Sequence, residues 1–170
     1  MSDTPMMYRA TVPVLQRALR NLANVLEKGR AHAEARKIDP AVLLGCRLAP
    51  DMFALTRQVQ IAADIAKAGA ARLAGHEVPA FEDNETTFEE LQARIGRTLE
   101  LIAGIPPAAY DGAAEREISI KMRGNPVTFT GQQYWEYFVI PNVFFHATTA
   151  YAILRHNGVE LGKSDFLGMP

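Results

Sequence analysis

Four stretches of the chain repeat apolar residues at spacings of three and four, and this pattern constrains the fold more than any other feature. Such spacing places the apolar side chains on one face of an α-helix, and each helix must bury that face against the others. We therefore predict an all-α fold in which four long helices pack antiparallel as a bundle. A chain of 170 residues is the size of one domain, so residues 1–170 are expected to form a single helical domain. The four apolar stripes are Leu15, Leu19, Leu22 and Leu26; Met52, Leu55, Val59, Ala62, Ala66, Ala70 and Leu73; Phe88, Leu91, Ile95, Leu99 and Ile102; and Val143, Ala147, Ala150 and Leu154.

Glycine, proline and capping residues predict where the helices begin and end. Gly29 is a plausible stop for the first helix. Asp39-Pro40 is typical of a helix start, and Gly45 closes the short helix that follows. The second long helix is expected to begin near Asp51, which would then be its N-cap or a first-turn acid. Two further starts are indicated by the capping boxes Thr87–Glu90 and Thr130–Gln133.

One segment has the period of a β-strand. Apolar and polar residues alternate on both sides of Gly124-Asn125, which is a typical two-residue hairpin turn. Pairing across that turn would place Met122 opposite Val127 and Ile120 opposite Phe129. An isolated hairpin is marginal in water, so its apolar face is expected to lie over the end of the helices.

Charge and composition limit the partners. The chain has 18 Lys and Arg against 19 Asp and Glu, a net charge of −1, which gives no general reason to bind nucleic acid or an anionic membrane. No apolar run reaches the length of about 18 residues that suggests a membrane span. Cys46 is the one cysteine, so no internal disulfide can form. The first residues lack the pattern of a secretory signal, and we expect a soluble, cytoplasmic protein.

Candidate chemistry centres on His146. The sequence has no GxGxxG, P-loop, HExxH, CxxC or GxSxG motif. His146 lies in the middle of the last long helix, and Asn142 lies four residues before it on the same face. A polar pair that faces inward must be hydrogen-bonded, because burying it unpaired is costly. One interpretation is a buried histidine bonded to another helix, and the other is a ligand or a catalytic group.

Several segments resemble one known family. The segment Phe145–Val159 resembles the last bundle helix of DinB-like proteins. Four others are similar to a bacterial branch of that superfamily that is known only as a domain of unknown function. The resemblance implies a four-helix bundle and, often, a homodimer. The four segments are Leu43–Met52, Gln58–Ala62, Phe81–Thr87 and Gly162–Leu167.

The resemblance also implies where a site would lie. Many DinB-like proteins resemble metalloenzymes that hold a divalent metal with one histidine on the second helix and an HxxxH pair on the last. Here His146 matches the second histidine of that pair, Asn142 stands at the first, and Gln58 is the counterpart on the second helix. Asp51 completes the candidate cleft. Neutral amides are poor ligands for zinc or nickel, so no bound metal or other cofactor is expected.

Two classes of function follow. The first is a metal-free DinB-like protein that binds a small molecule at the degenerate metal cleft or mainly forms a homodimer. The alternative is a metal-dependent thiol transferase or isomerase-like enzyme that uses His146 as a zinc or nickel ligand or as a base. The sequence alone does not decide whether the protein is an enzyme. A DNA-binding role is disfavoured by the charge balance.

Overall fold

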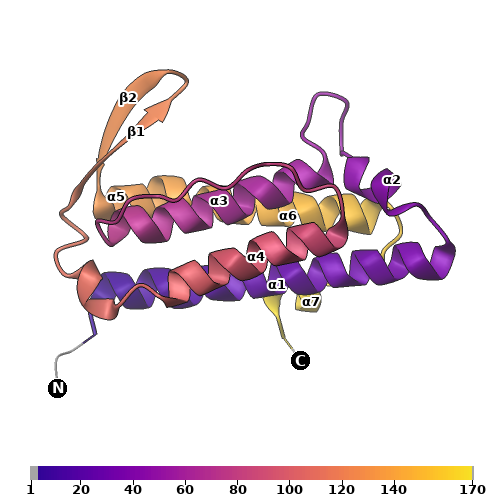
Figure 1. The fold of residues 1–170 in the computed structure, drawn as a ribbon, viewed down its shortest axis with the longest axis horizontal. Coiled ribbons are helices and arrows are strands. Elements are labelled where there is room, and N and C mark those ends of the chain that lie inside the picture. The colour runs from indigo at the N-terminus through magenta and orange to yellow at the C-terminus, as the bar shows by residue number, and fades with distance from the viewer. Residues whose placement is uncertain (1–3, 170) are drawn as a thin grey trace.

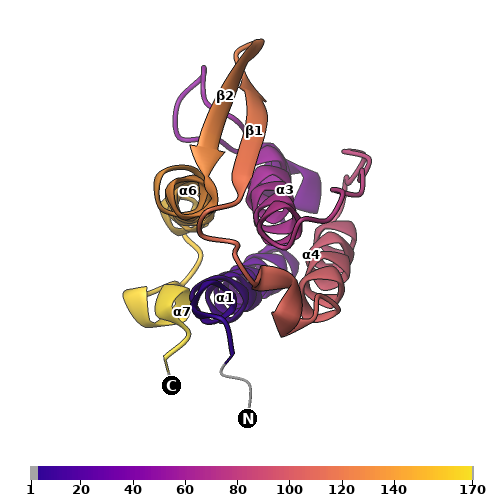
Figure 2. The ribbon, with the colours of Figure 1, turned by 90° about the vertical axis from the view of Figure 1, so that its left-hand side faces the viewer.

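The computed structural model describes residues 4–169 and is mostly helical, with one small antiparallel sheet. Four long helices, α1 (Met6–Arg36), α3 (Leu55–Leu73), α4 (Phe88–Ala103) and α6 (Ile140–His156), lie side by side along the length of the molecule (Figures 1 and 2). The predicted predominance of helix and the single hairpin are therefore confirmed. The short elements are α2 (Pro40–Gly45), the 3₁₀ helix η1 (Pro107–Tyr110), β1 (Glu117–Met122), β2 (Asn125–Thr130), α5 (Gly131–Tyr134), the π-helix η2 (Trp135–Val139) and α7 (Lys163–Leu167).

The long helices are not all antiparallel to their neighbours. The α3–α6 pair is antiparallel, because Gln58 meets His146 whereas Gly69 faces Val139. The α3–α4 pair is parallel, since residues 74–87 run back along the molecule before α4 begins (Figure 1). The α1–α6 pair is parallel as well, because Ala18 of α1 lies near Phe144 of α6 whereas Gly29 lies against Leu154. Helices α3 and α4 lie between these two helices in the sequence. The expectation of antiparallel packing throughout is therefore wrong for two of the neighbouring pairs.

Small residues allow the helices to approach closely. The buried face of α3 is rich in alanine, and Gly69 lies so near to η2 that a Cβ there would be 2.6 Å from Val139 Cγ1. Gly29 has the same function in α1, where a Cβ would be 2.9 Å from Leu154 Cδ2. The prediction that Gly29 ends the first helix is wrong for this reason. Gly29 lies against Leu154 of α6, and α1 continues to Arg36.

The cap predictions at Asp39, Thr87 and Thr130 are confirmed. Asp39 Oδ1 accepts from the N–H of Ala41 at 3.0 Å. Both capping boxes have the expected reciprocal bonds, one at Thr87 and one at Thr130. Each cap satisfies backbone donors that a helix start would otherwise leave unpaired.

One helical stretch, Gly131–His156, is long and apolar enough to cross a membrane, with a mean hydropathy of 1.3. Its apolar residues serve another purpose here. Val143, Ala150 and Ile153 are buried in the core, where α6 packs on α3 and α1. The arrangement fits a soluble protein whose core helix happens to be apolar.

The C-terminal helix α7 is fastened across α1. Asn21 Nδ2 donates to the carbonyl of Phe166 at 3.0 Å, and Arg17 Nη2 donates to the carbonyl of Leu167 at 2.9 Å. Lys28 pairs with Asp165 at 2.6 Å. The segment that follows α6 therefore contains a short helix with three polar anchors on the first helix.

The hairpin forms, but its register differs from the prediction by two residues. Ile120 pairs with Val127, and Arg123 and Gly124 make the two-residue loop with φ of 50° and 84°. Positive φ at both loop residues is the type I′ geometry. The pair that flanks such a loop exchanges both backbone hydrogen bonds, and the next pair exchanges none. The observed register places Pro126, which has no N–H, in a pair that exchanges none. The expected turn at Gly124-Asn125 would have required Pro126 to donate.

The apolar face of the hairpin stays the same after this shift. Ile118 and Ile120 are buried, and Phe129 packs 6.1 Å from the ring of Tyr134 at the start of the last helical stretch. Met122, by contrast, is exposed at the loop. The base of the hairpin is thus attached to the helices, as expected, whereas its tip projects from them (Figure 1).

A matched pair of loop variants tests this turn. Gly124→Val should destabilise the hairpin by about 1–2 kcal/mol, because a β-branched residue disfavours positive φ. Arg123→Asn should stabilise it by up to about 1 kcal/mol, because Asn tolerates this conformation better than Arg. Backbone chemical shifts and thermal unfolding would measure both effects. Destabilisation by Arg123→Asn would contradict the type I′ assignment.

Candidate functional site

The structure brings two of the predicted site residues together. Gln58 lies in the first turn of α3, and His146 lies in the middle of α6 on the face toward α3. His146 Nδ1 is 2.7 Å from Gln58 Oε1, and both side chains are buried. Gln58 Nε2 donates in turn to the carbonyl of Phe53 at 3.1 Å. The contact depends on the close antiparallel packing of the two helices.

These bonds define the protonation of the histidine. The Gln58 amide nitrogen is used by Phe53, so the amide oxygen faces the ring and can only accept. His146 Nδ1 must therefore carry the proton that it donates. Burial lowers the pKa of His146, and the nearby charge of Arg57 lowers it further. The imidazole is neutral at pH 7, and the lone pair is on Nε2.

Asn142 lies one turn before His146 but is bonded elsewhere. Its side-chain Nδ2 donates to the carbonyl of Phe138 in its own helical stretch at 2.6 Å. That stretch is irregular, because the π-helix η2 ends there and Pro141 cannot donate a backbone bond. Asn142 thus supplies a donor where the backbone pattern is interrupted. The expected polar cluster of Asn142 with His146 is not formed.

Asp51 lies outside the helix that it was expected to start. It is exposed in the connection before α3, which begins at Leu55 with Ala54 as its N-cap. The prediction that Asp51 is the N-cap or a first-turn acid of this helix is therefore wrong. The backbone bond from Leu55 N–H to the carbonyl of Cys46 closes residues 46–55 into a loop that delays the helix.

The chemistry of the donor set does not fit a transition metal. His146 offers one imidazole nitrogen, and Gln58 and Asn142 offer amides already bonded to Phe53 and Phe138. Within residues 4–169, no three His, Cys, Asp or Glu side chains come together as a metal-binding group. Zinc and nickel sites in proteins are built from imidazole, thiolate and carboxylate ligands.

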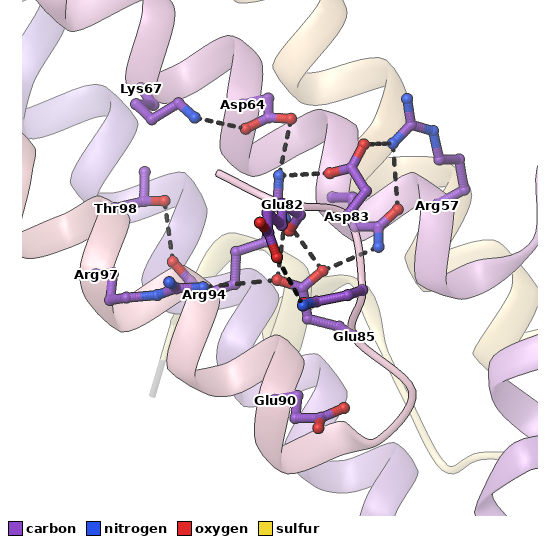
Figure 3. A network of polar contacts seen from close by, with 12 residues as sticks. Arg57, Asp64, Lys67, Glu82, Asp83, Glu85, Glu90, Arg94, Arg97 and Thr98 are labelled. Carbon is purple, nitrogen blue, oxygen red and sulfur yellow. Dashed lines mark hydrogen bonds and ion pairs between the residues drawn. The ribbon is translucent and has the colours of Figure 1, made fainter. Parts of the chain in front are cut away.

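A second polar centre, which the sequence analysis missed, surrounds Arg94 (Figure 3). Arg94 is in α4 and its side chain is fully buried. Its guanidinium pairs with Asp64 of α3 at 2.8 Å, with Asp83 at 2.8 Å and with Glu85 at 2.9 Å. The position could have been noticed, because Arg94 interrupts the apolar face between Leu91 and Ile95. An arginine on a buried face needs anionic partners.

Further pairs extend this centre on both sides. Arg57 pairs with Asp83, and Gln60 Nε2 donates to Glu85 at 2.9 Å. On the other side, Lys67 Nζ lies 3.9 Å from the centroid of the Phe81 ring. The partners come from α3, from α4 and from the connection between them. The centre therefore holds residues 81–85 against both helices.

The charges in this centre are mutually stabilising. Burial opposes the charged form of Arg94, but its bonds to Glu85 and the charges of Asp64 and Glu85 keep the pKa of Arg94 above its ordinary value. Burial likewise opposes ionisation of Asp83, yet Arg57 and Arg94 lower its pKa below the ordinary range. Arg94 and Asp83 therefore stay charged at pH 7, and they are held in ion pairs with each other and with neighbouring side chains. This arrangement is suited to holding the connection in place rather than to proton transfer.

Comparisons with known proteins agree with this fold. Residues 7–167 match the family model described as a domain of unknown function (DUF1993). The chain is also similar to a solved structure, the crystal structure of a DinB family member protein from Shewanella denitrificans. The identity is 46%, the match covers 97% of this chain and 93% of that one, and the TM-score is 0.90. No curated protein matches the chain.

A double-mutant cycle tests the His146–Gln58 bond. His146→Ala should lower the unfolding free energy at pH 7 by about 1–3 kcal/mol, through lost packing and an orphaned amide. The double variant with Gln58→Ala should lose less unfolding free energy than the two single variants lose together, because the two residues share one bond. The double variant with Asn142→Ala should lose about as much as its two single variants together. Urea unfolding of the variants, with the exposed His156→Ala as a control, measures these values.

The same variants predict a pH dependence. The folded pKa of His146 is below the value of about 6.5 in an unfolded chain, so the unfolded state binds more protons between the two. The contribution of His146 to the free energy of unfolding is complete above about pH 6.5 and is lost as the pH falls through the pKa of the folded state. The difference in stability between wild type and His146→Ala should narrow from pH 7 to pH 5. A constant difference would show that the ring titrates normally.

Removing the buried arginine tests the second centre. Arg94→Met should cost about 3–5 kcal/mol, because three carboxylates lose their shared partner. Arg97→Ala is the matched control, since its side chain is 55% exposed and its pairing with Glu85 is at 3.6 Å. That change should cost no more than about 1 kcal/mol. If urea unfolding shows that Arg94→Met and Arg97→Ala lower the unfolding free energy equally, Arg94 does not hold residues 81–85 against the helices.

Proposed function

Because the chain belongs to the DinB-like family described as a domain of unknown function (DUF1993), we propose its function from its own site: it is a metal-free binding protein whose Gln58–His146 pair receives a small molecule. The helices would form the four-helix bundle of DinB-like proteins, with this pair between α3 and α6. The observation that supports the proposal is the 2.7 Å contact between His146 Nδ1 and Gln58 Oε1. It fixes the ring as a neutral acceptor with its lone pair on Nε2.

The surroundings of His146 indicate the class of ligand. A lone pair on Nε2 accepts a hydrogen bond from a hydroxyl or an amine. The ring of Phe145 stands nearly perpendicular to the imidazole at 5.1 Å, and its side chain is exposed. The exposed ring of Phe53 lies under Arg57, 6.0 Å from the guanidinium carbon. A small aromatic molecule with a hydroxyl group fits these neighbours.

Exposed aromatic side chains support a homodimer. Tyr137 and Phe145 of the last helical stretch are 68% and 59% exposed, and Phe53 is 56% exposed. Large aromatic side chains are enriched where protein surfaces meet. A second copy of the chain would cover these side chains and border the His146 site. The proposal includes a cytoplasmic location and no nucleic-acid or membrane partner, in keeping with the net charge of −1.

The enzyme alternative has less support. A metal-dependent thiol transferase or isomerase would need a ligand set for zinc or nickel, and the amides of Gln58 and Asn142 do not provide one. The neutral His146 could serve as a base without a metal, yet its Nδ1 partner is an amide. A carboxylate partner would stabilise the protonated ring, whereas an amide does so less. Binding is therefore the function that this geometry favours.

Phenol and anisole form a matched pair of probes for this site. Phenol can donate to His146 Nε2, whereas anisole has the ring without the donor. Phenol should shift the ¹⁵N resonance of Nε2 and bind at least about fivefold more tightly, as expected for one hydrogen bond. His146→Phe should remove this preference. Equal binding of both probes, or shifts at other residues only, would refute the proposal.

Metal analysis tests the proposal that the protein is metal-free. Protein purified without a histidine tag should carry well under one zinc or nickel per chain. The double variant Gln58→His, Asn142→His has three imidazoles and should take up zinc at about one per chain. Stoichiometric metal in the wild type that is lost in His146→Ala would show that the site is a metal centre.

A further inference from the structure

A separate cavity lies on the opposite side of α6, where α1, α6 and α7 meet. Its volume is 190 Å³. Val14 and Ala18 of α1 form one wall, Phe144 of α6 another, and Phe166 of α7 the third. The rings of Phe144 and Phe166 stand edge to face at 6.4 Å. The walls are apolar, and none of the Gln58–His146 site contributes to them.

The size of the cavity suits a single aromatic ring. A protein cavity of about 150 Å³ lined by apolar side chains is large enough to bind benzene. The present cavity is somewhat larger, which leaves space for one short substituent. Aromatic rings also pack well beside other rings in the edge-to-face geometry that Phe166 already adopts with both Phe144 and Tyr151.

The charge at the mouth specifies the substituent. Among residues 4–169, Arg17 is the one charged residue that borders the cavity. Its Nε and Nη2 both donate to the carbonyl of Leu167, at 3.3 Å and 2.9 Å, and Nη1 takes part in neither bond. These bonds hold the guanidinium at the rim. A guanidinium held in this way favours a carboxylate.

We propose that this cavity binds a small aromatic carboxylate, with the ring against Phe144 and Phe166 and the carboxylate at Arg17. The ligand contacts α7, so it binds only when α7 lies on α1. Binding is therefore linked to the docking of the C-terminal helix, and an occupied cavity stabilises that helix by mass action. This site is independent of the function proposed for His146.

The test titrates the full chain with sodium benzoate and follows backbone amide resonances. Benzoate should shift amides near Val14, Phe144 and Phe166 and slow amide hydrogen exchange in α7. Benzyl alcohol keeps the ring without the charge, and acetate keeps the charge without the ring. Benzyl alcohol should bind at least about fivefold more weakly, the ratio expected for loss of an ionic contact at an exposed arginine. Acetate should also bind at least about fivefold more weakly, because it loses the apolar contacts of the ring.

Two variants and a control separate the contributions. Arg17→Gln should weaken benzoate about fivefold more than it weakens benzyl alcohol, because the alcohol loses only the α7 anchor whereas benzoate also loses the ionic contact. Val14→Phe should block the binding of both benzoate and benzyl alcohol, since the larger side chain fills the cavity opening. Arg20→Gln, an exposed change on α1 outside the cavity, should bind as the wild type does. The proposal is overturned if benzoate and acetate produce the same shifts, if Arg17→Gln binds benzoate as the wild type does, or if Val14→Phe, while folded, still binds.

Discussion

The buried guanidinium of Arg94 determines how the helices can be connected. Residues 74–87 run the length of the molecule without helix or strand, and a segment of that kind has few contacts of its own. Arg94 supplies them by binding Asp83 and Glu85 of the connection together with Asp64 of α3. Because the connection returns to the far end before α4 begins, α3 and α4 run in the same direction. The order of the helices in space therefore depends on one buried charge and three acids.

Much of the fold could be predicted from local signals. The apolar spacing and the capping boxes located the long helices, because caps satisfy donors whatever the tertiary fold is. Gly29 was misread because a glycine that stops a helix and a glycine that admits a neighbouring helix look alike in sequence. The predicted hairpin register was wrong by two residues, although the position of Pro126 indicates the correct register. A residue without an N–H must avoid the hydrogen-bonded pair beside the loop.

The site was less predictable, since it depends on which side chains meet across helices. His146 and Gln58 could be matched from a resemblance, and the antiparallel α3–α6 contact brings them to 2.7 Å. Spacing placed Asn142 on the same face as His146 but could not show that it bonds to its own backbone. That bond follows from the π-helix, which no sequence pattern indicated. Arg94 was overlooked because its partners lie in a connection that has no periodicity.

The fastening of α7 to α1 has a consequence for folding during synthesis. Arg17 and its partner Leu167 are 150 residues apart in the sequence, and Asn21 and Phe166 are 145 residues apart. Contacts between such distant segments cannot form until α7 has left the ribosome. The apolar stripe of α1 must also wait for α4 and α6, which cover it. Helix α1 is thus fully packed only after α7 has been made, and a chain that stops before residue 163 leaves the α7-facing side of α1 uncovered.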